Sequence, residues 1–155
     1  MSRAFVKEKE NVPLDGPPEL ELGEGPNLVT RAGLEQIDRN VALIQAELTE
    51  SVDEATRNRL SRDLRYWDAR KATAQLVVPK SAESVEFGTR VTIERNGKRQ
   101  VITIVGTDEA DPKDGRLNWQ APLAAALLGG RSGETVTLEN RGSSQKITIC
   151  LIEIP

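Results

Sequence analysis

The apolar residues of this chain follow a helical period in its first half and an alternating period in its second half. The first pattern is a row spaced 3, 4, 3 and 4 residues apart: Leu34, Ile37, Val41, Ile44 and Leu48. That spacing is typical of the a/d stripe of a coiled coil. Beyond Pro79, apolar and polar residues alternate as they do in strands. A helical unit and a sheet unit therefore share the 155 residues, and the predicted fold class is α+β.

The helical unit, residues 29–78, is predicted to be an antiparallel hairpin. Thr30 is a suitable N-cap for the first helix, which we expect to end near Glu50, where residues 49–53 favour turns and caps. The second helix is expected from about Asp53 to Gln75. It continues the stripe through Leu60, Leu64 and Trp67. Because the two stripes can pack on each other, the hairpin buries its apolar residues without a partner chain. A monomer is therefore the simplest expectation.

The segments directly before and after the hairpin have few residues that could form a hydrophobic core. Residues 1–28 hold four of the eight prolines among glycines and acidic residues, so we expect a disordered N-terminal tail. A docking tail is the alternative, and Phe5 and Val6 are its only plausible anchor. Residues 79–84 are predicted to be a linker.

Residues 85–155 are predicted to form a compact domain of strands with one short helix. Asn96-Gly97 between alternating segments is a strong signal for a β-hairpin. An acidic turn at 108–115 precedes a short strand at 116–118, and Pro122 suits the first position of a helix at 122–128. Strands near 135–139 and 146–154 complete the domain. Cys150 lies in the last of these and is expected to be buried and structural.

Composition excludes several classes of function. The chain has no histidine and a single cysteine, which leaves neither a Ser-His-Asp or Cys-His centre nor an ordinary zinc site. A net charge of −3 and a pI near 5.2 argue against affinity based on nucleic-acid phosphates, so any contact with nucleic acid is expected to be indirect. With neither a membrane span nor a signal peptide in the sequence, we expect a cytoplasmic protein.

The second predicted helix is rich in basic residues: Arg57, Arg59, Arg62, Arg65, Arg70 and Lys71. These residues are interpreted either as the solvated face of a coiled coil or as a groove for an acidic partner.

Three segments of the second half resemble the GreA/GreB family of bacterial transcript cleavage and elongation factors. They are FGTRVTI at 87–93, IVGTDEAD at 104–111 and APLAAALLG at 121–129. The resemblance extends over residues 30–154. It implies an N-terminal antiparallel coiled coil and a C-terminal domain of FKBP-like fold. It also implies docking at the secondary channel of RNA polymerase, through a surface around Asp108, Glu109, Asp111, Pro122 and Leu123.

The same resemblance has departures. The family's serine before the proline is Ala121 here, and its arginine in the short helix is Ala125. The acidic tip loop of the Gre factors has no counterpart, and both helical arms are several turns shorter. The nearest acidic group is Glu50, Asp53 and Glu54, whose other interpretation is charge that favours the N-terminus of the second helix. A short hairpin without the acidic tip also resembles the Rnk type of regulator, which binds polymerase without stimulating cleavage.

These observations favour a non-enzymatic elongation regulator that binds RNA polymerase at the secondary channel and does not cleave transcripts efficiently. One alternative is a cleavage-stimulating factor in which Glu50 and Asp53 act in the polymerase site. In that case they would share a Mg²⁺ with the polymerase; otherwise we expect no cofactor. A prolyl isomerase is the other alternative, but such pockets are lined by several aromatic residues, and this domain offers only Phe87 and Trp119.

Overall fold

A computed structural model describes residues 16–155 of the chain. The described residues form two compact units. One consists of residues 16–25 and 37–73, and the other of residues 26–36 and 74–155. Within residues 16–155, no helix combines the length and the apolar character needed to cross a membrane.

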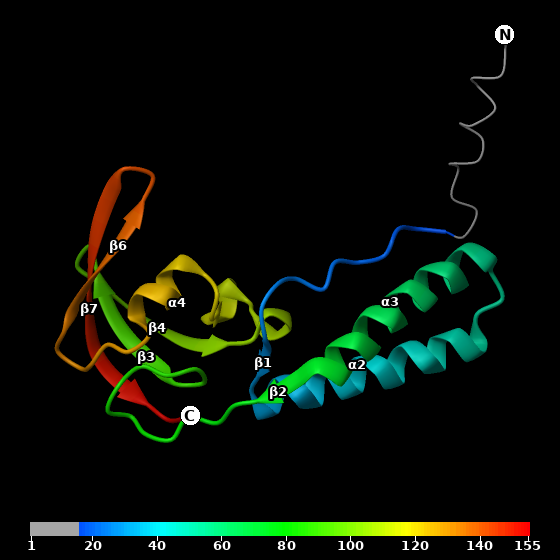
Figure 1. Ribbon diagram of the computed structural model, residues 1–155, viewed down its shortest axis with the longest axis horizontal. Coiled ribbons are helices and arrows are strands. Elements are labelled where there is room, and N and C mark those ends of the chain that lie inside the picture. The colour runs from blue at the N-terminus through cyan, green and yellow to red at the C-terminus, as the bar shows by residue number, and fades with distance from the viewer. Residues whose placement is uncertain (1–15) are drawn as a thin grey trace, which may run out of the picture. The chain divides into compact units, whose positions relative to one another are not determined.

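Two helices of 20 residues each, α2 (Arg31–Glu50) and α3 (Glu54–Thr73), run in opposite directions and are joined by residues 51–53 (Figure 1). Thr30 caps α2 as predicted, because its Oγ1 accepts a hydrogen bond of 3.0 Å from the amide of Gly33. The predicted end of the first helix at Glu50 is also confirmed. Ile37 on α2 and Leu60 on α3 are buried, with 1% and 5% of their surface exposed.

The chain departs from the prediction on both sides of this helix pair. The second helix ends at Thr73 rather than Gln75, because Ala74–Leu76 forms strand β2. Its parallel partner is β1 (Asn27–Val29), which lies where the tail was expected to be disordered. Val29 is 2% exposed, so the short pairing also buries apolar surface. Residues 1–15, with the candidate anchor Phe5 and Val6, lie outside the described residues.

A five-stranded sheet dominates the second unit, with strand order β5-β4-β3-β7-β6. Its strands are β3 (Arg90–Arg95), β4 (Lys98–Val105), β5 (Arg116–Asn118), β6 (Thr135–Asn140) and β7 (Ser143–Glu153). The β4/β5 pair is parallel and the other pairs are antiparallel. The predicted turn between β3 and β4 is confirmed, since Asn96 and Gly97 both take positive φ angles, 53° and 74°.

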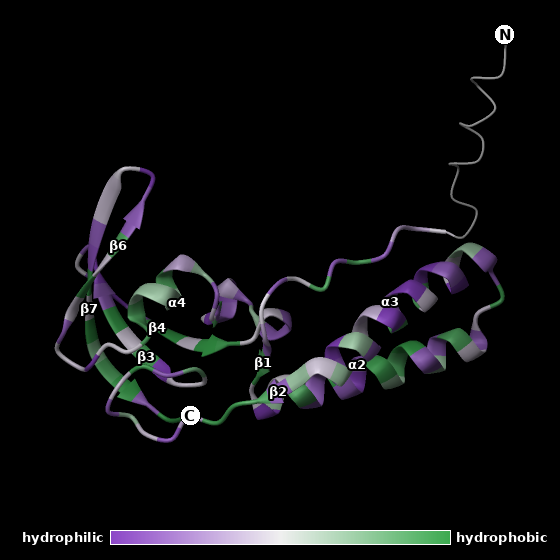
Figure 2. Cartoon of the chain, viewed as in Figure 1, coloured by the Kyte–Doolittle hydropathy of each residue, from purple (hydrophilic) through white to green (hydrophobic). Residues whose placement is uncertain are grey.

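The core lies between this sheet and the short helix α4 (Pro122–Leu127), as Figures 1 and 2 show. Ile93, Ile104, Leu127, Ile147 and Ile149 are all fully buried there. Cys150 lies in the predicted strand but is only half-buried. A register shift pairs Ile93 with Ile149 and Thr92 with Leu151, so Cys150 is the extra residue of a bulge.

Candidate functional site

The segment from the end of β4 to the first turn of α4 contains all five residues that the sequence suggested for polymerase contact. Two 3-10 helices, η2 (Thr107–Glu109) and η3 (Pro112–Asp114), form the acidic turn, and β5 follows them. Strand β4 and α4 thus hold the two ends of the loop on the same domain core. The five side chains have different environments, which divide them into internal and accessible groups.

Glu109 is an internal residue. Its side chain is 6% exposed, and its carboxylate accepts three hydrogen bonds from protein donors. The donors are the amide of Thr30 (3.0 Å), the hydroxyl of Thr30 (2.5 Å) and the amide of Gly106 (3.2 Å). Because Thr30 is the N-cap of α2, the carboxylate also lies at the positive end of that helix. This placement gives Glu109 a structural role within the fold.

Two glycines make room for this carboxylate. A Cβ atom on Gly33 would lie 2.3 Å from both Cδ and Oε2 of Glu109. On Gly106, a Cβ would lie 2.3 Å from the carbonyl oxygen of Leu28. The Gly106 distance is to backbone, so glycine is required there by close approach, whereas a side chain at position 33 would displace the Glu109 carboxylate from its hydrogen bonds. Glu109 is therefore packed tightly against the end of β4 and the start of α2.

The other four predicted contact residues fall into two classes. Leu123 is 9% exposed and belongs to the domain core, so its side chain packs α4 against that core. Pro122 is exposed at the first position of α4, and Asp108 and Asp111 are half-buried. The carboxylate of Asp111 accepts from the amide of Lys113 (3.2 Å), which caps η3. Asp108, Asp111 and Pro122 are the members of the set that a partner can reach.

Arg116 is a residue of this loop that sequence analysis missed. Its Nε donates to the carbonyl oxygen of Glu109 (2.9 Å), and its guanidinium pairs with Asp111 (3.7 Å) and Asp114. The sequence signal was a single arginine directly after a turn with three aspartates. By holding both 3-10 helices, Arg116 orders the acidic loop that presents Asp108 and Asp111.

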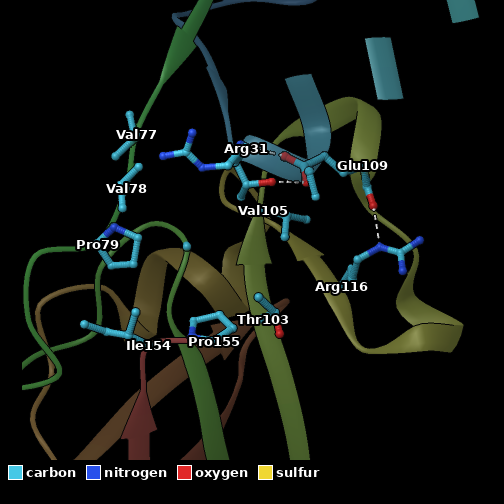
Figure 3. Close-up of a pocket in the computed structure, with 13 residues that line it drawn as sticks. Arg31, Val77, Val78, Pro79, Thr103, Val105, Glu109, Arg116, Ile154 and Pro155 are labelled. Carbon is cyan, nitrogen blue, oxygen red and sulfur yellow. Dashed lines mark hydrogen bonds between the residues drawn. The ribbon is translucent and has the colours of Figure 1, made fainter. Parts of the chain in front are cut away.

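A pocket of about 400 Å³ lies beside Glu109 within the second unit (Figure 3). Its apolar wall consists of Ala32, Val77, Val78, Pro79, Val105, Ile154 and Pro155. The polar side chains that line it include Arg31 and Arg116. Neither Phe87 nor Trp119 lines this pocket: Phe87 is buried in the core and Trp119 packs against the core. The aromatic lining of an isomerase pocket is therefore missing at this site.

The three tip residues Glu50, Asp53 and Glu54 lie where α2 ends and α3 begins. Asp53 caps α3, since its Oδ2 accepts from the hydroxyl (2.8 Å) and the amide (2.9 Å) of Thr56. These hydrogen bonds, led by that from the hydroxyl, hold the pKa of Asp53 below its ordinary value, and Arg59 lowers the pKa further. Within residues 16–155, no group of three or more acidic or sulfur side chains could hold a metal ion.

Comparison with known proteins agrees with the motifs in this loop. The C-terminal domain described as "Transcription elongation factor, GreA/GreB, C-term" matches residues 72–154. Transcription elongation factor GreA of Roseiflexus castenholzii is 33% identical over 148 residues, which cover 90% of this chain and 94% of that protein. Transcription elongation factor GreB of Neisseria meningitidis is 32% identical over 98 residues, or 61% of this chain and 60% of that protein.

Among solved structures, the GreA factor homolog 1 protein of Thermus thermophilus aligns with a TM-score of 0.40 and 18% identity. The alignment covers 83% of this chain and 99% of that one. Family membership rests on the family-model match and the two sequence relatives above, to which this structural likeness adds nothing. On these relations, the chain belongs to the GreA/GreB family of transcription elongation factors.

Proposed function

We propose that this chain binds RNA polymerase at its secondary channel and regulates elongation without efficient transcript cleavage. Family membership supports RNA polymerase as the partner. In this proposal, the second unit docks through the outer surface of the β4–α4 loop, and the α2/α3 pair, an antiparallel coiled coil, enters the channel. The docking residues are Asp108, Asp111 and Pro122, while Glu109 and Leu123 hold the loop from inside.

The observation that carries the second part of this proposal is the state of Asp53. Stimulating cleavage in trans would require tip carboxylates that hold a Mg²⁺ and orient a water molecule with sub-ångström accuracy. Asp53 Oδ2 is engaged by both donors of Thr56, and this engagement serves the first turn of α3. Each helix of the pair has 20 residues and is thus about 30 Å long. A cap at the end of a short arm fits a regulator that occupies the channel better than a cleavage factor.

The alternative retains cleavage, with Glu50 and Asp53 as the acting carboxylates. It has one observation in its favour, namely that Asp53 is exposed and its lowered pKa keeps it ionised at neutral pH. An ionised carboxylate is the form that binds a metal ion. The isomerase alternative has no comparable support, because the pocket beside Glu109 lacks aromatic side chains.

A transcription assay separates the two readings. RNA cleavage is measured in a stalled, backtracked elongation complex of the cognate polymerase, with the wild-type chain and with Glu50→Ala/Asp53→Ala. We expect binding to polymerase by both proteins and no stimulation of cleavage by either. Stimulation by the wild type that disappears in the double variant would overturn this part of the proposal and establish a cleavage factor.

The docking part is tested on binding alone. Asp108→Ala/Pro122→Ala is expected to weaken binding to the core polymerase by about tenfold, which corresponds to about 1.4 kcal/mol. The matched control is Glu83→Ala, an exposed acidic residue of the same unit outside the loop. Equal affinities of wild type, docking variant and control would contradict the assignment of the docking surface.

A further inference from the structure

An acidic segment before the helix pair lies along α3 in the first unit (Figure 1). We call residues 16–25 the strap. The strap meets α3 at three points. Gly16 adjoins Asn58, the carboxylate of Glu19 pairs with the guanidinium of Arg65 (2.5 Å to Nη2 and 2.8 Å to Nε), and the carbonyl oxygen of Leu22 accepts from Nη1 of Arg70 (2.8 Å). The helix positions increase together with the strap positions, so the two segments run in the same direction.

The spacing of these contacts shows that the strap is extended. The 12 residues from Asn58 to Arg70 span about 18 Å of helix at 1.5 Å per residue. The six residues from Gly16 to Leu22 span about 19 Å at the polyproline II rise of 3.1 Å. Pro17 and Pro18 favour that conformation, because each ring fixes φ near the polyproline II value. The lengths therefore match over all three contacts.

Charge, rather than apolar burial, holds the strap in place. The strap has three glutamates and no basic residue, whereas α3 has six basic and three acidic residues, a net charge of +3. The apolar side chains of the strap, Leu20 and Leu22, remain 41% and 47% exposed. The Glu19–Arg65 pair is itself exposed on both sides, and such pairs are weak and screened by salt. A strap held in this way can be displaced by a competitor with the same chemistry.

We propose that this face of α3 is a binding site for an extended acidic peptide of a partner protein, and that the strap is its autoinhibitory internal occupant. The contacts identify the ligand class. Arg65 recognises a carboxylate, and Arg70 recognises a main-chain carbonyl oxygen, which a peptide has and a nucleic acid lacks. Arg70 is only 6% exposed and lies 5.9 Å from the ring of Tyr66, so its position is set by its surroundings. This site is separate from the docking surface of the second unit.

The variant Gly16→Ala/Glu19→Ala is designed to open the strap. Gly16 has a φ of +98°, and a Cβ there would lie 2.9 Å from Cβ of Asn58, so alanine pushes the start of the strap away from α3. Glu19→Ala removes the ion pair. Glu47→Ala, an exposed acidic residue of α2, is the control for the change in net charge. Glu19→Ala alone serves as a second opened form if the double variant folds poorly.

The probe is a synthetic peptide with the sequence of residues 17–25, added to the isotope-labelled full-length chain. A tethered segment has an effective concentration of about 1 mM or more. We therefore expect the opened variant to respond at about tenfold lower peptide concentration than the wild type or Glu47→Ala. The readout is the shift of the Arg65 and Arg70 side-chain NH resonances in NMR spectra. Arg65→Gln in the opened variant should abolish the response, whereas Arg59→Gln, on the same helix but outside the strap contacts, should retain it.

Two results would overturn the proposal. Equal responses of the wild type and the opened variant would show that the strap does not mask the face. A response to a single-stranded oligonucleotide of nine nucleotides, with none to the peptide, would show that the face takes phosphates instead. Hydrogen exchange provides a readout that is independent of the ligand, since the amides of residues 19–25 should exchange faster in the opened variant than in Glu47→Ala.

Discussion

Glu109 connects the loop after β4 to the start of α2 through a single carboxylate. Glu109→Ala leaves the two donors of Thr30 and the amide of Gly106 without their acceptor in a largely buried place. Because unsatisfied buried donors destabilise a fold, we expect the free energy of unfolding to fall by about 2–4 kcal/mol in urea titrations. Glu109→Gln retains one carbonyl acceptor and should lose less. An unchanged midpoint for Glu109→Ala would show that water replaces the carboxylate at no cost.

Ala121 is a position at which a single substitution should stabilise the domain. It is the N-cap of α4, with extended backbone (φ −67°, ψ 148°) and no side-chain hydrogen bond to the helix. Serine at such a position accepts a hydrogen bond from a first-turn amide and stabilises by about 1 kcal/mol relative to alanine. Ala121→Ser should thus raise the Tm in a calorimetric scan. Ala125→Ser, an exposed position inside the same helix, is the control and should give no increase.

At the scale of elements, the first turn of α3 depends on an ionised Asp53. A lowered pKa means that this cap stabilises α3 above the pKa of an unfolded aspartate, about 3.9, and that the stabilisation is lost as pH falls through the lower folded value. We expect the amide resonances of Thr56 and Arg57 to be constant from pH 7 to 5 and to shift at lower pH. The measurement is an NMR titration of the full-length chain.

Asp53→Asn provides the control for that titration. An asparagine side chain still offers an oxygen to the amide of Thr56 and is as good an N-cap as aspartate, but it does not titrate. The shift at low pH should therefore disappear in this variant while α3 stays capped. If the amides of Thr56 and Arg57 shift alike in both proteins, another group is responsible and Asp53 is not the relevant cap.

For the whole molecule, the two units differ in how much apolar surface they bury. The sheet unit has a core of twelve buried residues, whereas the helix pair buries only Ile37, Val41 and Leu60 among its described apolar side chains. Local stability follows buried contacts, so the amides of β3 and β7 should exchange most slowly and those of α3 fastest among regular elements. Native-state hydrogen exchange with mass spectrometry measures this order. Equal protection of α3 and β3 would imply one cooperative unit.

Much of the fold was predictable because its signals are local. The 3,4 spacing, the cap Thr30 and the Asn96-Gly97 turn each act over a few residues, and all appear where expected. The second helix was predicted to end at Gln75 but ends at Thr73, because the local pattern does not show a pairing with a distant segment. Residues 74–76 continue a helical pattern, but their pairing with residues 27–29, almost 50 positions away, makes them a strand.

The candidate site was predictable only as a segment. The motif at 104–111 and the helix at 121–129 led to the correct family, yet their letters do not distinguish a buried carboxylate from an exposed one. Glu109 and its neighbour Asp108 look alike in sequence. The structure separates them by burial, because Thr30, 79 positions from Glu109 along the chain, donates to the Glu109 carboxylate, which is buried, whereas Asp108 is half-buried.

The sequence by itself determined the two long helices, the strands of the five-stranded sheet and the family to which the chain belongs, since period, caps, turns and motifs are properties of short stretches. It did not determine the strand pair of residues 27–29 and 74–76. Tertiary structure decided which acidic residues serve the fold and which remain accessible. It also decided that residues 16–25 lie along α3, through contacts between residues 46 and 48 positions apart. Such contacts form between groups that are far apart along the chain and close in space, so a local sequence pattern does not predict them.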